Sequence, residues 1–427
     1  MLDLRLIRRE PDTVRAALAR RGPDLAERVD RVVELDASWR EATQLAEALR
    51  AEQKTASEQV AAAKRTRSPG GSQGTGDKQD VSAQLERLKQ VSSQVKQLGE
   101  RARQAEAELH ELLATLPNLP DPTAAEPDDE VVRVVGDASK TGRDHLDLAG
   151  DRIDMERAAR LSGARFAYLR GDLVMLELAL VQWVMTKLRG KGFEPVIPPV
   201  LVREHALFGT GYFPDTEQQI YHLPADDLYL VGTSEVAIAS LHAGEILDVA
   251  DLPRRYAGFS SCFRREAGAA GKDTRGIFRV HQFDKVEMFS FVEPDRSNDE
   301  HELLLSIEEE IFSELEVPYR VVNIAVDDLG ASAAKKYDIE AWLPGQGRYA
   351  ELTSTSNTTD FQARRLEIRM RGAKPRPEIL HTLNGTAIAI SRTIIALLEN
   401  GQREDGSIAL PAALAPYGAP AELPPAG

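Results

Sequence analysis

Length, composition and charge already exclude several classes of protein. The chain has 427 residues, 42% of them hydrophobic, which is enough for two domains with packed cores. Its formal net charge of −15 argues against general electrostatic binding of nucleic acid, so such binding would need local basic patches. A single cysteine excludes an internal disulfide and a cysteine-rich zinc site. With no signal peptide and no membrane-length apolar run, we expect a soluble cytoplasmic protein without membrane partners.

Residues 1–116 are predicted to form a helical N-terminal domain. After a short helix between Pro11 and Gly22, apolar residues follow a 4-3 spacing that breaks in the glycine-rich segment 66–78 and resumes until Leu116. Two such runs around a tight break predict an antiparallel helical hairpin over residues 25–116, each helix about 60 Å long. Basic residues gather at its tip: Lys64, Arg65, Arg67 and Lys78. The spacing alone is compatible with a dimerisation coil or with an arm that reaches RNA.

The remainder of the chain is predicted to be an α+β domain around an antiparallel sheet. Residues 117–170 form a linker and the entry to this core, and strand-like and helix-like segments then alternate irregularly over residues 171–415. The last segment, 416–427, is rich in alanine and proline and is predicted to be a flexible tail.

Residues 262–289 carry the most informative pattern. Arg264 and Glu266 are two apart, so on a strand they would share one face. After a loop with glycine, lysine and arginine, a second alternating run puts five more side chains on one face: Arg279, His281, Phe283, Lys285 and Glu287. Guanidinium, carboxylate and aromatic groups on one surface suit a triphosphate, a purine ring and an ammonium group.

This stretch resembles motif 2 of the class II aminoacyl-tRNA synthetases, in the form found in seryl-tRNA synthetases. Phe-Arg-Arg-Glu-Ala-Gly precedes Gly-Ile-Phe-Arg-Val-His-Gln-Phe, and residues 192–200 and 383–392 resemble motifs 1 and 3. The apolar run of residues 383–392 is expected to be helical. The resemblance runs from residue 1 to 400. It implies a class II antiparallel sheet flanked by helices, a homodimer formed through motif 1, and an N-terminal arm that contacts the long variable arm of tRNA-Ser.

The resemblance also implies a two-step reaction that uses ATP and Mg²⁺ but no zinc. The carboxylate of L-serine attacks the α-phosphate of ATP to give seryl-adenylate, and the seryl group then passes to tRNA. A carboxylate is already a nucleophile, so the first step needs alignment and positive charge rather than a general base. Arg264, Glu351 and Arg392 are the implied catalytic residues.

By the same resemblance, Arg264 grips the α-phosphate and the serine carboxylate, and Glu266 accepts a hydrogen bond from the adenine amino group. Phe283 stacks on adenine, and Arg392 reaches the γ-phosphate. The full implied ATP set is Arg264, Arg265, Glu266, Val280, Phe283, Glu351, Leu352, Thr353, Ser354 and Arg392. Glu351 and Ser354 hold the metal, as suits Mg²⁺. The implied serine set is Thr233, Ser234, Glu235, Arg264, Glu287, Asn384 and Thr386, with Thr386 on the serine hydroxyl and Glu287 on its amino group. Lys272 and Arg275 in the motif 2 loop are expected to dock the tRNA acceptor end.

Several alternatives stay open at the level of the sequence. Thr233-Ser-Glu235 is expected to be extended, with Thr233 and Glu235 on one face, but it also fits a helix cap. Phe283 and Val280 also fit plain core packing. Many relatives have glycine at the position of Ser391 and proline at that of Ala237, which leaves room for an inhibitor-tolerant duplicate of the enzyme. A non-catalytic tRNA-binding paralogue and an enzyme that delivers the amino acid to a carrier protein are further readings. Selenocysteine tRNA, which shares the long variable arm, is an additional substrate if the host makes it.

Overall fold

The computed structural model describes the backbone of residues 1–65, 75–214, 217–267 and 275–426, and their side chains except at 62–65, 75–82, 84, 85 and 217. Contacts divide the chain into two units, which are Leu4–Leu116 and a larger unit of Met1–Asp3 with Pro117–Gly427. None of the described helices is both long and apolar enough to cross a lipid bilayer.

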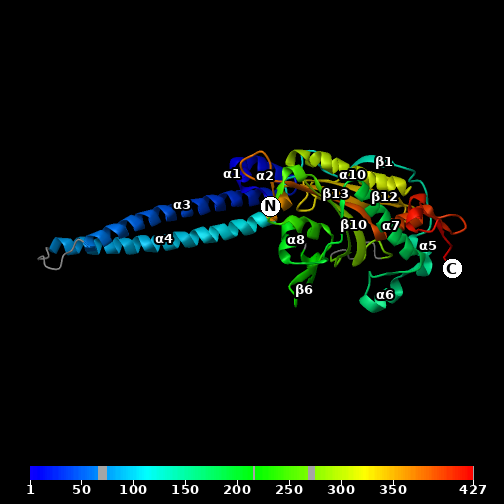
Figure 1. The fold of residues 1–427 in the computed structure, drawn as a ribbon, viewed down its shortest axis with the longest axis horizontal. Coiled ribbons are helices and arrows are strands. Elements are labelled where there is room, and N and C mark those ends of the chain that lie inside the picture. Colours follow the sequence, from blue (N-terminus) through cyan, green and yellow to red (C-terminus); the bar gives the residue numbers. More distant parts are fainter. Residues whose placement is uncertain (66–74, 215–216, 268–274, 427) are drawn as a thin grey trace. The chain divides into compact units, whose positions relative to one another are not determined.

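The smaller unit is helical throughout. It contains α1 (Leu4–Arg9), α2 (Pro11–Ala19), α3 (Pro23–Arg65) and α4 (Thr75–Thr115), and the last two lie antiparallel along their whole length (Figure 1). Apolar side chains at the predicted spacing, such as Val32, Ala42 and Leu109, are buried between them. The predicted helical hairpin is therefore confirmed. Its proposed tip residues Lys64, Arg65, Arg67 and Lys78 lie outside the side chains that the structure describes.

The larger unit is built on an eight-stranded sheet. In spatial order its strands are β1 (Glu130–Val135), β11 (Tyr319–Asn323), β12 (Lys335–Leu343), β13 (Arg348–Thr359), β16 (His381–Ala389), β10 (Gln282–Val292), β9 (Arg254–Phe263) and β4 (Glu194–Val196). Every neighbouring pair is antiparallel except β4 and β9, which are parallel. This is the antiparallel sheet flanked by helices that the sequence predicts.

Three helices bury apolar side chains in the core of this unit. They are α7 (Asp172–Gly190), α10 (Ser297–Glu314) and α12 (Ile390–Gly401), and α7 and α10 are seen beside the sheet in Figure 1. Each contributes residues spaced three or four apart, as a helix with one apolar face must. Leu176 and Leu180 of α7, Ile307 and Ile311 of α10, and Ile394 and Leu398 of α12 all belong to one core cluster.

Shorter elements surround the sheet. They are α5 (His145–Ala149), β2 (Ile153–Asp154), α6 (Met155–Ser162), β3 (Tyr168–Leu169), β5 (Leu201–Val202), α8 (Glu204–Thr210), β6 (Tyr221–Leu223), β7 (Leu228–Leu230), α9 (Glu235–Ala239), β8 (Ile246–Asp248), α11 (Phe361–Arg365), β14 (Arg369–Arg371), β15 (Glu378–Ile379), β17 (Ile408–Ala409) and β18 (Glu422–Leu423).

Three local expectations from the sequence are wrong. β9 ends at Phe263, and Glu266 has a left-handed backbone with φ of +50°, so Arg264 and Glu266 do not alternate on a strand. Residues 383–389, expected to be helical, continue strand β16, because the motif 3 helix begins only at Ile390. The tail is not frayed, since β18 pairs with β17 and Leu423 is fully buried in the core.

Candidate active site

The side chains proposed from the sequence converge where β9, β10, β13, β16 and the start of α12 meet. Two adjoining cavities lie there. One is lined by Arg264, Glu266, Phe278, Arg279, Val280, Phe283, Glu351, Leu352, Ser391 and Arg392, and we call it the nucleotide cavity. The other is lined by Tyr212, Glu235, Arg264, Glu287, Lys336, Glu351, Ser354, Asn384 and Thr386, and we call it the amino-acid cavity. Arg264, Lys285, Glu351 and Thr386 line both.

Arg392 is fixed at one wall of the nucleotide cavity by contacts with Glu351 and Phe278. Its Nη1 donates to the carbonyl oxygen of Glu351 at 2.9 Å and lies 3.3 Å from the Oε1 atom of the same residue. Its guanidinium carbon is 4.6 Å from the ring centroid of Phe278, in a cation–π contact. Since α12 begins two residues earlier, the guanidinium sits at the first turn of that helix with its position set by strand β13.

The carboxyl of Glu351 remains charged in this setting. Desolvation acts to raise its pKa, but the positive charges of Arg392, Lys336 and Arg264 outweigh it and leave the pKa below its usual value. The side chain is still 45% exposed, so its oxygens remain accessible from the cavity.

Arg264 follows the end of β9 and lies between the two cavities. Backbone pairing of Phe263 with Val231 fixes this end of the strand, and the Nε of Arg264 donates to the carbonyl of Gly232 at 3.3 Å. The guanidinium carbon is 5.3 Å from the ring centroid of Phe283. Its terminal nitrogens are therefore left to face anions in either cavity. A planar guanidinium can bind two anions in this arrangement better than a lysine ammonium can.

Glu266, proposed to contact adenine, has one oxygen engaged by a neighbouring guanidinium. Nη1 of Arg279 donates to its Oε2 at 2.9 Å. Its side chain lines the nucleotide cavity. Val280, predicted beside the nucleotide, is buried in the same wall.

The amino-acid cavity contains a buried network around Lys285 and Glu287. These residues lie two apart on β10, so they share a face, and Lys285 forms an ion pair with Glu287. Lys285 also donates to Thr233 Oγ1 at 2.9 Å. Glu287 stands opposite Thr386 in the pairing of β10 with β16, and the Thr386 hydroxyl is 3.5 Å from its Oε2. Charge compensation by Lys285 allows a carboxylate to remain buried here.

Glu235 also lines this cavity, and each oxygen of its buried carboxyl accepts a side-chain hydrogen bond. The hydroxyl of Tyr212 donates to its Oε2 at 3.1 Å, and Nε2 of Gln362 donates to its Oε1 at 2.7 Å. Burial and the neighbouring charge of Glu287 raise its pKa. The extended conformation predicted for Thr233–Glu235 is wrong, since Glu235 begins α9 and Thr233 Oγ1 accepts its backbone N–H at 3.2 Å.

The two residues proposed as ligands of a divalent cation, Glu351 and Ser354, both lie on β13. Glu351 and Ser354 are three apart, and both line the amino-acid cavity. Behind them Asp338 of β12 pairs in register with Ser354 and lies 3.1 Å from the Nζ atom of Lys336. Burial is the main cause that raises the pKa of Asp338 to about 7, and the charge of Lys336 opposes it. A carboxylate, a hydroxyl and further oxygens from phosphate would suit Mg²⁺.

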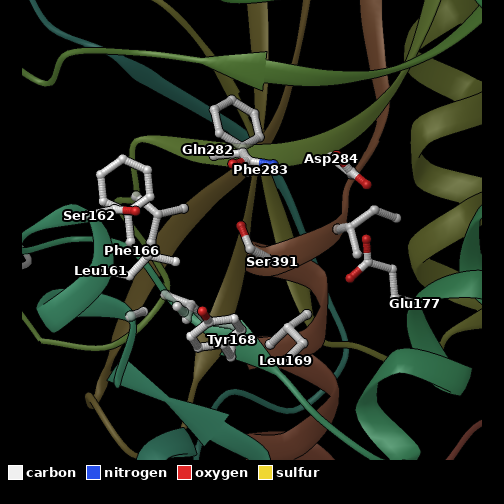
Figure 2. A pocket seen from close by; sticks show the side chains of 15 residues that line it. Leu161, Ser162, Phe166, Tyr168, Leu169, Glu177, Gln282, Phe283, Asp284 and Ser391 are labelled. Carbon is white, nitrogen blue, oxygen red and sulfur yellow. The ribbon is translucent and has the colours of Figure 1, made fainter. Parts of the chain in front are cut away.

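A third cavity lies beside the nucleotide cavity and shares Val280, Phe283 and Ser391 with it (Figure 2). Most of its wall is aromatic and aliphatic, with Leu161 of α6, Tyr168 of β3 and Phe283 of β10 among the side chains. Two carboxyl groups also line it, Glu177 of α7 and Asp284 of β10. Burial and hydrogen bonding with Asp284 raise the pKa of Glu177 to about 7.

A few of the proposed residues do not line either of the first two cavities. The Thr353 hydroxyl donates instead to the buried Glu308 at 2.8 Å, and the Ser234 hydroxyl approaches the Gly258 carbonyl at 3.4 Å. Arg265 is exposed, and so is Arg275. Lys272 lies outside the described residues.

Sequence reasoning assigned no individual contact to several residues that shape the site. Tyr212 and Gln362 hold Glu235, Arg279 pairs with Glu266, and Phe278 supports Arg392. Arg279 and Phe278 lie within the stretch that resembles motif 2, so the sequence offered a signal there. Tyr212 and Gln362 carried none.

Comparison with known proteins gives first the class and then the family. Residues 221–401 match the family model described as tRNA synthetase class II core domain (G, H, P, S and T), so fold and site define a class II aminoacyl-tRNA synthetase. Residues 1–120 match the model of the seryl-tRNA synthetase N-terminal domain.

Individual relatives agree over the full length. The Serine--tRNA ligase of Thermobifida fusca is 49% identical over 425 residues, covering 98% of this chain and 97% of that protein. The Serine--tRNA ligase of Acidothermus cellulolyticus is 49% identical over 429 residues, covering 98% of each. A crystal structure of seryl-tRNA synthetase from Pyrococcus horikoshii complexed with ATP matches with a TM-score of 0.92 and 40% identity over 100% of both chains. The chain belongs to the seryl-tRNA synthetase family.

Proposed function

We propose that this protein activates L-serine with ATP and transfers the seryl group to tRNA-Ser. The observation that carries this is the placement of Arg264 and Glu351 at the junction of the two cavities. A nucleotide in one cavity and an amino acid in the other would meet at a guanidinium able to contact both a phosphate and a carboxylate. Names of the relatives, and the ATP in the Pyrococcus horikoshii structure, support the same substrates.

In the first step a serine carboxylate oxygen attacks the α-phosphorus, and the bond to the bridging oxygen of pyrophosphate breaks. Arg264 aligns the two anions and stabilises the charge that develops on the α-phosphoryl oxygens. Arg392 and Phe278 form the wall for the purine and the distal phosphates. In the second step a ribose hydroxyl of tRNA attacks the seryl carbonyl, and AMP leaves.

Serine itself is held by groups suited to its three polar parts. Its carboxylate faces Arg264, its ammonium faces Glu287, and its hydroxyl reaches Thr386. Lys285 forms an ion pair with Glu287, so the charge of this buried carboxylate is compensated before the substrate binds. A site that hydrogen-bonds a substrate hydroxyl rejects analogues lacking it by roughly 10⁴ to 10⁵, which makes proofreading against alanine unnecessary.

Mg²⁺ would be held by Glu351 and Ser354. Bound there, it supplies a Lewis acid that neutralises phosphate charge. The retained negative charge of Glu351, with its lowered pKa, supports this role.

The proposed assembly is a homodimer formed through α7 and the strand that follows it. This part of the larger unit exposes apolar side chains that a monomer would leave in water: Val174, Met175, Leu178 and Ile197. Leu178 is 57% and Ile197 81% exposed. Leu178→Glu should convert a dimer to monomers in sedimentation velocity. An unchanged sedimentation coefficient would place the interface elsewhere.

Two assays on the purified chain test the function. Serine-dependent exchange of pyrophosphate into ATP should occur without tRNA, and serine should be esterified to tRNA-Ser when that tRNA is added. Exchange without charging would favour transfer to another acceptor, such as a carrier protein. Absence of exchange alongside tRNA binding would favour a non-catalytic paralogue. tRNA-Sec in place of tRNA-Ser tests the additional substrate, and a serine-adenylate mimic as inhibitor tests the inhibitor-tolerant duplicate.

The helical hairpin of residues 25–116 is the proposed contact for the long variable arm of the tRNA. Since translation uses the product, the proposed site of action is the cytoplasm. Deleting the hairpin between residues 31 and 108 should spare serine-dependent exchange and abolish charging. Loss of both steps would refute a role confined to tRNA binding.

A further inference from the structure

A buried histidine outside the cavities contacts the chain segment that enters β10. His145, the first residue of α5, is 1% exposed, and its Nδ1 lies 3.2 Å from Oε1 of the buried Glu399 on α12. The other oxygen of Glu399 accepts the backbone N–H of Gly345 at 2.8 Å. An acceptor-only carboxylate beside Nδ1 selects the tautomer in which Nδ1 carries the hydrogen and donates to Glu399.

The opposite edge of the same imidazole lies against Gly276. Nε2 of His145 is buried and has no hydrogen-bond partner among the described residues. A Cβ atom built on Gly276 would be 2.0 Å from this nitrogen, and the φ of Gly276 is +77°. Close approach and a left-handed backbone both require glycine here. The ring therefore sets how far the chain at Gly276 can move toward the core.

The position of Gly276 affects the nucleotide cavity, because Phe278, two residues further along the chain, lines it. Phe278 packs against the guanidinium of Arg392 at 4.6 Å, and its carbonyl accepts from Nε of Arg392 at 3.4 Å. Arg392 and Glu399 are seven residues apart, about two turns, so they lie on the same side of α12. Helix α12 therefore contacts residues 276–278 in two ways. Arg392 contacts Phe278 directly, and Glu399 acts on Gly276 through His145.

A metal site is the competing explanation for this cluster. Asp144, His145 and Glu399 place three ligand-type atoms within 4.8 Å of one another. However, Glu399 accepts backbone hydrogen bonds on both oxygens, from Gly345 and from His145, and Asp144 accepts the N–H of Leu146 at the start of α5. Hydrogen bonds account for these carboxylates without an ion.

We propose that His145 and Glu399 are positioning residues for ATP binding. They hold Gly276, and through it Phe278, in the place where Arg392 and Phe278 together form the wall of the nucleotide cavity. They touch neither substrate. The inference rests on the proposed function, because it assigns the pair to the ATP half of that active site.

The test uses His145→Asn, which removes the contact with Gly276 while keeping a donor to Glu399. The Asn amide can replace Nδ1 as donor to Glu399 but does not reach Gly276. In serine-dependent pyrophosphate exchange we expect the KM for ATP to rise about tenfold, the KM for serine to stay within twofold, and the melting temperature to stay near that of the wild type. The matched control is His242→Asn. His242 is also buried and contacts a glutamate, Glu245, at 2.7 Å, but it lines neither cavity of the active site.

The possible outcomes separate this inference from the proposed function. A wild type without serine-dependent exchange would refute the function. An active wild type with an unchanged KM for ATP in His145→Asn, or with both KM values raised equally, would overturn the positioning role. If His145→Asn fails to fold, Glu399→Gln provides the second test, because it keeps the size of the side chain but removes the charge that orients the ring. The same selective rise in the KM for ATP is expected, and its absence overturns the proposal.

Discussion

Replacing Thr386 by valine tests the proposed choice of serine over alanine. Thr386 lies on β16 in the wall shared by both cavities and is buried. Its hydroxyl is 3.5 Å from both Glu287 and Lys285, at the long limit for a hydrogen bond. The hydroxyl is therefore weakly engaged within the protein and available to a substrate. Valine has nearly the same shape, so packing of the strand should be preserved.

The size of the effect follows from the partner that serine loses. A net hydrogen bond contributes about 0.5–1.5 kcal/mol, and a buried polar group left without a partner costs about 1–3 kcal/mol. Since Lys285 keeps its contacts with Thr233 and Glu287, the loss falls mainly on the substrate hydroxyl. At about 1.4 kcal/mol per factor of ten, kcat/KM for serine should fall roughly 5- to 150-fold. Alanine has no hydroxyl to lose, so its kcat/KM should hardly change.

The assay is pyrophosphate exchange with serine and with alanine as alternative substrates. Thr386→Val should reduce the serine-to-alanine ratio of kcat/KM by the same factor as kcat/KM for serine, with the KM for ATP unchanged. Thr393→Val is the matched control, because that buried hydroxyl on α12 has no hydrogen-bond partner in the described part of the chain. If serine loses less than threefold, or alanine falls in parallel, Thr386 does not read the hydroxyl.

Further predictions concern the nucleotide wall and the carboxyls on β12 and β13. Arg392→Lys loses the planar contact with Phe278 and should raise the KM for ATP about tenfold without changing that for serine; a parallel rise in both would contradict the separation of the cavities. Glu351→Gln should raise the Mg²⁺ concentration needed for half-maximal exchange about tenfold, and an unchanged requirement would remove Glu351 from the metal site. Burial raises the pKa of Asp338 to about 7, above its unfolded value, so folding takes up a proton and stability falls as pH rises from about 4 to 7. Asp338→Asn should therefore melt higher relative to wild type at pH 8 than at pH 5, and an equal difference at both pH values would refute the shift.

Periodicity along the sequence predicted the larger elements because their burial is regular. The 4-3 spacing predicted both long helices of the hairpin, since the two helices pack against each other along an apolar stripe. Alternation likewise placed Phe283, Lys285 and Glu287 on one face of β10, where the structure has them. Arg279 and His281 of the same predicted run precede the strand, so their part of the prediction is wrong. Motif order then indicated the family, which the comparisons confirm.

Local patterns failed where a strand gives way to irregular backbone. Arg264 and Glu266 have the spacing of strand neighbours, yet the strand ends at Phe263 and Glu266 is left-handed. At residues 383–389 a predicted helix is a strand instead. This apolar run lies in β16, which pairs with β13 and β10 and is largely buried on both faces. Runs of this kind fit a buried strand as well as a buried helix, because neither leaves a polar face to mark its period.

The residues missed altogether act across long separations in the chain. Glu235 is held by Tyr212 and Gln362, and the latter is 127 positions away. His145 and Glu399 are 254 positions apart. In each case a buried carboxylate needs donors that its own neighbours do not supply, and the fold supplies them from elsewhere. A sequence shows which carboxylates are present but not which will be buried, so the donors that make burial tolerable become visible only when the chain is folded.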